Sequence, residues 1–158
     1  MKKIFIISGL TIFLILLTDF LIGSYLLRFT TKKINPTKNH NIYDHDLKKN
    51  FKEILEWVPG KYYTLCTDKN SFRNFCDKID SNDKEFDIAF IGDSFTEGIG
   101  LNYEDTFVGR ISEQLIEYKI ANLGVVSYSP SIYFSKLNYL IENDFKFDRV
   151  IIYFDISD

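Results

Sequence analysis

Apolar and polar residues divide the chain into three stretches. Residues 4–27 are apolar almost throughout, residues 29–50 are rich in Lys, Asn and Asp, and apolar runs return after that. A helix over residues 4–27 would be about 36 Å long, against a hydrocarbon core of about 30 Å. The pattern predicts a transmembrane signal anchor over residues 1–28 that contacts membrane lipid, a polar stalk over 29–50 and a folded domain over 51–158.

The flanks of the apolar stretch leave its topology open to more than one interpretation. Asp19 lies inside it and costs roughly 2.5–3.5 kcal/mol at the centre of a membrane helix. A cleaved signal peptide beginning with Lys2 and Lys3 is the alternative, but no convincing small-x-small cleavage site follows. Basic residues after the stretch favour a cytoplasmic domain, whereas large domains are translocated largely regardless of charge. We expect a single-pass membrane protein with its domain on the periplasmic, extracytoplasmic side.

Cysteine and histidine usage restricts the chemistry. Cys66 and Cys76 lie in a polar region and are spaced so that a disulfide can close a small loop in an oxidising compartment; two unrelated thiols in a reducing cytosol are the alternative. No CxxC or Cys/His spacing indicates zinc, and we expect no metal or cofactor. His40 and His45, the only histidines, fall in the predicted stalk and receive no catalytic role.

Short apolar runs alternate with amphipathic stretches in the second half of the chain. Strands are predicted over residues 86–91, 120–123 and 149–154. Apolar positions recur every three or four residues between them, which predicts two helices, one capped by Asn102 or Asp105 and one by Ser129 with Pro130 as its first residue. This alternation predicts an α/β fold with a parallel, doubly wound sheet.

Three polar or glycine residues follow these strands and should gather at one edge of the sheet. They are Ser94, Gly124 and Ser157. A serine hydroxyl needs a base and oxyanion donors to attack a carbonyl, and a glycine lets a carbonyl oxygen approach its N–H closely. A strand-Gly-Asp-Ser turn also arises simply because Gly permits the bend and Asp or Ser caps the next helix. The net charge of -3 and the scattered basic residues argue against nucleic-acid binding.

Several of these segments resemble the conserved blocks of one enzyme family. FIGDSFTEG (residues 90–98) resembles the first block of the SGNH, or GDSL-type, hydrolase superfamily, and NLGVVSYSP (residues 122–130) resembles the second. Residues 150–158 resemble the third block, and DKNSFRN (residues 68–74) resembles a segment that often precedes the first block in membrane-linked members.

The resemblance implies an incomplete, C-terminally truncated three-layer α/β/α sheet of flavodoxin-like form. It implies Ser94 as nucleophile, the N–H groups of Ser94 and Gly124 as oxyanion donors, and Asp93 and Asp158 as supporting residues. Ser157 stands where the family has an asparagine donor, and losing such a donor costs about 10²–10³ in rate. The family's Asp-x-x-His block would lie beyond residue 158 and no histidine follows Ser94, so we expect no turnover by this chain.

The family would make this domain a serine esterase or O-acyltransferase acting on ester groups, in the first place acetyl groups, of a cell-envelope glycan. The substitution at Ser157 and the missing histidine support the alternative, a non-catalytic envelope protein that binds a glycan at the same edge. A phosphate-binding flavodoxin-like protein is a third hypothesis, for which no glycine-rich phosphate motif is found.

Overall fold

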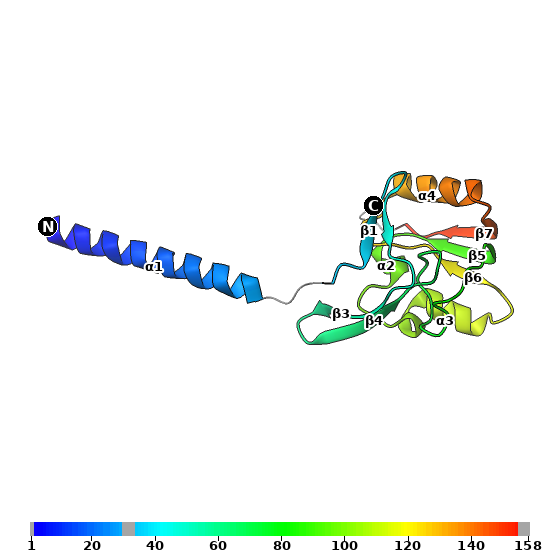
Figure 1. Cartoon of the computed structure of the whole chain (residues 1–158), viewed down its shortest axis with the longest axis horizontal. Helices are drawn as coiled ribbons and strands as arrows, with labels where there is room; N and C mark the ends of the chain where they lie inside the picture. The colour runs from blue at the N-terminus through cyan, green and yellow to red at the C-terminus, as the bar shows by residue number, and fades with distance from the viewer. Residues whose placement is uncertain (1, 30–33, 155–158) are drawn as a thin grey trace. The chain divides into compact units, whose positions relative to one another are not determined.

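The computed structural model describes residues 2–29 and 34–154, and the chain divides into two units, residues 1–34 and residues 35–158. The first unit contains helix α1 (Lys2–Phe29). The second contains all the strands and the remaining helices (Figure 1).

The predicted transmembrane anchor, and the single-pass membrane localisation that rests on it, are wrong. Within the described residues, no helix is both long enough and apolar enough to cross a membrane. The apolar run of α1 contains an acid, Asp19, which is costly inside a membrane helix.

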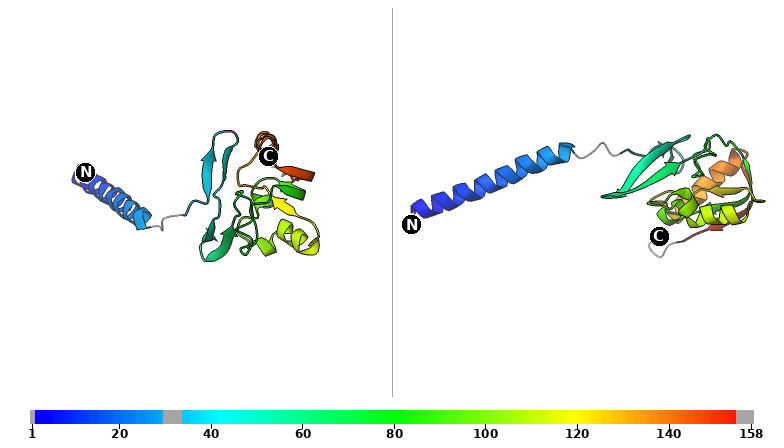
Figure 2. Two further views of the ribbon diagram at one scale, coloured as in Figure 1. Left: turned by 45° about the vertical axis from the view of Figure 1, so that its right-hand side comes forward. Right: turned by 90° about the horizontal axis from the view of Figure 1, so that it is seen from below.

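A three-stranded parallel sheet forms the centre of the second unit and confirms the α/β fold class. Strand β5 (Glu85–Ile91) lies in the middle, with β6 (Ile120–Asn122) on one side and β7 (Lys146–Ile152) on the other, as Figure 2 shows. The third strand begins earlier than the predicted residue 149, because its first residues pair with the beginning of β5.

Helices pack on the two faces of this sheet. Alternate side chains of a strand point to opposite faces. Ile88 and Phe90 of β5 belong to a cluster with Val108 of α3 (Phe107–Gln114), whereas Ala89 and Ile91 belong to the cluster that contains α4 (Pro130–Glu142).

The two helices begin in different ways. Helix α4 follows Ser129 and starts at Pro130, as predicted, although the Ser129 side chain makes no capping hydrogen bond. Helix α3 is capped by Thr106, whose Oγ1 accepts the Gly109 N–H at 3.0 Å, and not by Asn102 or Asp105. Asn102 instead accepts the Thr64 N–H, and Asp105 belongs to the short 3-10 helix η1 (Tyr103–Asp105).

Two antiparallel hairpins precede the parallel sheet. Strands β1 (Thr37–His40) and β2 (Asp44–Leu47) form the first, and β3 (Lys52–Val58) and β4 (Lys61–Cys66) form the second. The first hairpin lies where we expected a solvated stalk. It packs on the domain because Tyr43 and Leu47 are buried in the main core, and Asp46 forms a buried ion pair with Lys136 of α4.

A disulfide joins Cys66 at the end of β4 to Cys76, with a Cα–Cα distance of 5.2 Å. It closes the loop that carries Arg73, a residue central to the candidate site.

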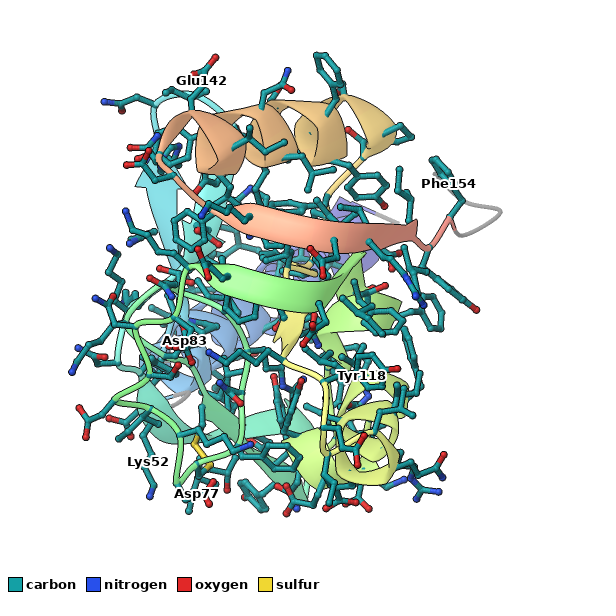
Figure 3. The ribbon with its side chains drawn as sticks, turned by 90° about the vertical axis from the view of Figure 1, so that its right-hand side faces the viewer. Lys52, Asp77, Asp83, Tyr118, Glu142 and Phe154 are labelled. Atoms are coloured by element: carbon teal, nitrogen blue, oxygen red, sulfur yellow. A yellow bond between two sulfur atoms is a disulfide. The ribbon has the colours of Figure 1, made fainter. Side chains whose placement is uncertain are left out.

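Strand β7 borders the sheet on the side away from β6. Val150, Ile151 and Ile152 expose 38–45% of their surface, and Phe154, labelled in Figure 3, lies beyond the carboxyl end of the strand and is 59% exposed. Apolar strand edges of this kind are prone to pair with other chains.

Candidate functional site

The predicted nucleophile lies on a tight turn at the carboxyl end of β5. Ser94 is half-buried and begins the one-turn helix α2 (Ser94–Glu97). Asp93, predicted as a supporting residue, is the cap of this helix: its Oδ1 accepts the Phe95 N–H at 2.9 Å. The helix ends at Gly98, which has a left-handed φ of 81° and donates its N–H to Ser94 O. The capping role expected of a plain structural turn is therefore present.

Gly92 is required because the backbone of β7 passes close to this turn. A Cβ on Gly92 would come within 2.9 Å of Tyr153 O and would collide with Thr96 Oγ1. Tyr153 donates its N–H to Ile91 O at 2.9 Å, which brings the residues after β7 to the same edge. Ser157 and Asp158, the other predicted site residues of this segment, lie outside the described residues.

Gly124 packs directly against the helix that carries Ser94. A Cβ at this position would come within 2.6 Å of Glu97 N and 2.7 Å of Thr96 Cβ. Only glycine allows this approach, so the structure brings together the two segments that the sequence placed at the carboxyl edge.

The Gly124 N–H, predicted to be an oxyanion donor, already has an intramolecular acceptor. It donates to Asn122 Oδ1 at 3.0 Å, and Asn122 Nδ2 donates to Thr96 O at 2.8 Å. Asn122 is buried and ties the end of β6 to α2. No role was predicted for Asn122, although it lies in the motif at residues 122–130.

A buried acid fixes the segment after Gly124. Glu97, 1% exposed, accepts the Val126 N–H at 2.6 Å through its Oε2. Burial raises the pKa of the Glu97 carboxyl, whereas the Val126 N–H and the charge of Arg73 lower it. The next residue, Ser127, has a left-handed φ of 63°, a conformation that is uncommon and costs energy for a non-glycine residue.

Arg73 holds the loop that follows α2. Its guanidinium donates to the carbonyl oxygens of Glu97, Gly98 and Leu101, the bond to Gly98 O being 2.7 Å long. The side chain is 1% exposed, and burial lowers the pKa of its guanidinium. Arg73 lies in the motif at residues 68–74, so the sequence drew attention to this segment. Its role could not be predicted, because the carbonyl oxygens that it binds come near only in the folded chain.

One buried hydroxyl at the centre of the site lacks a partner. Thr96 Oγ1 is fully buried and makes no hydrogen bond to any described residue. It lies beside Gly92, and the Thr96 Cβ lies beside Gly124. A buried polar atom without a partner calls for a bound water or ligand group.

The histidines are not solvated linker residues. His45 Nδ1 lies 2.6 Å from Asp44 Oδ2, and its Nε2 lies 2.7 Å from the carbonyl oxygen of Val126. His40 stacks on Tyr43 with ring centroids 3.6 Å apart. Within the described part of the chain, neither ring forms a hydrogen bond with the Ser94 hydroxyl.

The candidate site is thus an edge built from backbone groups that a few buried side chains, among them Glu97, Arg73 and Asn122, hold in place. Among residues 2–29 and 34–154, no group of three His, Cys, Asp or Glu side chains is arranged to hold a metal ion. No family model, curated protein or solved structure matches this chain.

Proposed function

We propose that Ser94 is an acyl-accepting nucleophile and that the domain acts on ester groups of a glycan, as the resemblance to SGNH hydrolases implies. The observation that carries this proposal is the contact of Gly124 with α2, which places the two motif segments against one another at the carboxyl edge of the sheet. Ligands of open α/β sheets bind at this edge.

In the proposed step the Ser94 hydroxyl attacks the ester carbonyl and its proton passes to a base. The alcohol leaves with a proton, and the acyl group remains on Ser94 until water or another hydroxyl accepts it. Because Asn122 holds the Gly124 N–H, that N–H becomes an oxyanion donor only if the substrate oxygen displaces Asn122 Oδ1.

Aromatic side chains next to the turn support a sugar or acyl ligand. Phe95, directly after Ser94, is 62% exposed. Trp57 of β3 packs on Gly100, where a Cβ would be 3.0 Å from the indole ring, and still exposes 56% of its surface. Binding sites of small molecules combine such apolar faces with a few polar groups.

Chemical rescue tests the proposal on this chain. Imidazole supplies the base, p-nitrophenyl acetate supplies the ester, and peptide mass spectrometry measures the acetylated fraction of each serine. We expect imidazole-dependent acetylation of Ser94 and none at the matched exposed serine, Ser131. Ser94→Ala should abolish the signal, and Ser131→Ala should leave it unchanged. If Ser94 is acetylated no faster than Ser131, the assignment of Ser94 as the nucleophile is refuted.

A second function, non-catalytic glycan binding at the same edge, is favoured by one observation. The Gly124 N–H is already satisfied by Asn122 in the absence of ligand. If Ser94 shows no acetylation while an acetylated oligosaccharide still shifts the NMR signals of residues 94–98 and 122–126, the binding function replaces the catalytic one.

A further inference from the structure

A cavity lies at the edge of the parallel sheet opposite to Ser94. Its volume is about 240 Å³, and it lies between the β1–β2 hairpin, the turn at residues 70–71 and the carboxyl end of α4. Lys84 directly precedes β5, and Asn143 and Phe145 precede β7, so the cavity belongs to the amino edge of the sheet. In Figure 3 this edge is marked by Asp83 and Glu142, and the carboxyl edge by Phe154.

The lining of this cavity is positively charged. Lys38, Lys49 and Lys84 all line it. Two of them bond to neutral atoms: Lys38 Nζ lies 3.3 Å from Ser71 Oγ, and Lys84 Nζ donates to Asn143 O at 2.9 Å. Among the described residues, none of the three has a carboxylate within ion-pair distance.

The single acid on the lining is already neutralised. Asp46 pairs with the buried Lys136 at 2.9 Å and accepts the Tyr43 hydroxyl at 2.9 Å. Burial lowers the pKa of the Lys38 ammonium, Asp46 opposes this, and Lys49 and Lys136 lower the pKa further. An excess of positive charge in a partly buried cavity favours a bound anion.

The rest of the lining suits a sugar ring. His40 and Tyr139 meet edge to face with ring centroids 4.8 Å apart, and both line the cavity. Asn70, Asn82 and Asn143 add amide groups that can both donate and accept hydrogen bonds. Ser71, another lining residue, is buried and has a left-handed φ of 74°. Strained backbone of this kind is concentrated at ligand-binding positions.

We propose that the amino-edge cavity binds a sugar that carries a carboxylate, sulfate or phosphate group. The anionic group lies among Lys38, Lys49 and Lys84, the ring packs on the aromatic side chains, and the hydroxyls bond to the asparagines. A neutral sugar would leave the lysine charges uncompensated, and a bare inorganic anion would leave the aromatic and amide surfaces without contacts. The site is independent of Ser94, which lies at the other edge.

Ligand-observed NMR and calorimetry test this proposal with four probes: glucuronate, glucose 6-phosphate, glucose and inorganic sulfate. For a single sugar we expect a dissociation constant on the order of 0.1–1 mM for the two charged sugars. The stronger of the two identifies the preferred anionic group. Equal binding of glucose would overturn the role of charge, and equal binding of sulfate would overturn the role of the sugar ring.

Substitutions at the amino edge locate the binding. Lys84→Gln and Lys49→Gln should each weaken binding of the charged sugar roughly tenfold, the size expected for a charge-assisted hydrogen bond. Lys146→Gln is the matched control, because Lys146 lies at the same edge but outside the cavity lining and pairs with Glu85. If all three substitutions weaken binding of the charged sugar equally, the effect comes from the general surface charge, and binding in the cavity is refuted. Circular dichroism verifies that each variant is folded.

Discussion

The two edges of the parallel sheet are built in different ways. At the carboxyl edge, Gly92 and Gly124 let three backbone segments approach, and Arg73 binds carbonyl oxygens. At the amino edge, side chains with full charges surround a cavity. Backbone donors fixed in place suit the stabilisation of a transient charge, whereas mobile ammonium groups suit a ligand that carries a permanent charge.

Because of this difference, the sequence alone predicts the carboxyl edge but not the amino edge. The carboxyl edge is encoded by short contiguous motifs, because a glycine and its neighbours along the chain make the close approach. The amino edge is assembled from Lys38, Ser71, Lys84 and Asn143, which are far apart in sequence. The experiments below test whether the two edges are independent, beginning with the largest expected effect.

Removing the Lys136 charge should damage both edges. Lys136 donates to Asp46 at the amino-edge cavity and to Leu123 O at 3.1 Å near the carboxyl end of β6. Lys136→Met leaves a buried carboxylate without its partner, and we expect the free energy of unfolding to fall by about 3–5 kcal/mol, measured by urea denaturation.

A double substitution distinguishes lost charge from lost packing. Lys136→Met with Asp46→Asn removes both charges and keeps oxygen and amide groups for the neighbouring bonds, so much of the lost stability should return. If the double variant is less stable than the sum of the two single effects predicts, the pair is not the source of the loss.

The turn beneath the amino-edge cavity should make stability depend on pH. Burial raises the pKa of Asp68 to about 6, against hydrogen bonds from the N–H groups of Phe72 and Asn70. An acid with a raised pKa favours the folded state while protonated, so its contribution is complete below about pH 4 and is lost as the pH rises through about 6. The loss amounts to roughly 3 kcal/mol.

Asp68→Asn should remove this dependence, because an amide keeps a carbonyl acceptor and does not titrate. Urea denaturation between pH 4 and pH 7 measures it. Asp80→Asn is the control, since Asp80 is exposed and pairs only at the surface with Lys69. An unchanged pH profile in Asp68→Asn would show that another group titrates.

The carboxyl edge is tested by Gly124→Ala. The added Cβ meets the backbone N of Glu97, so α2 must move, and we expect a loss of about 1–3 kcal/mol together with reduced imidazole-dependent acetylation of Ser94. Gly60→Ala is the control. Gly60 has a φ of +79° but nothing within 4 Å, so its replacement costs about 1 kcal/mol and should leave acetylation intact. Equal acetylation of Ser94 in the two variants would show that the reaction does not depend on the close approach of Gly124 to α2.

Elements held by contacts between residues close in sequence were predicted, whereas those held by contacts between distant residues were missed. Strands β5 and β6 and helix α4 were predicted closely, because apolar periodicity and the preference of proline for the first residue of a helix act over a few residues. The β1–β2 hairpin was missed because its polar sequence is held by the buried Asp46–Lys136 pair, whose members are ninety residues apart. Asn122 was missed as a site residue because its side chain bonds to Thr96 O of α2, which is 26 residues away in the sequence, as well as to the nearby Gly124 N–H.

The smallest effect is expected at an ion pair that is short but exposed. Lys146 Nζ lies 2.6 Å from Glu85 Oε1 at the amino edge, closer than Lys136 lies to Asp46, yet both side chains are about 70% exposed. Water already solvates these charges, so Lys146→Gln should leave the urea midpoint unchanged within experimental error, in contrast to Lys136→Met. Burial, and not distance, then determines which charges at this edge hold the fold and which remain available for a ligand. A fall in stability for Lys146→Gln comparable to that for Lys136→Met would mean that the amino-edge lysines are structural, and the cavity variants would then have to be judged by binding per folded molecule.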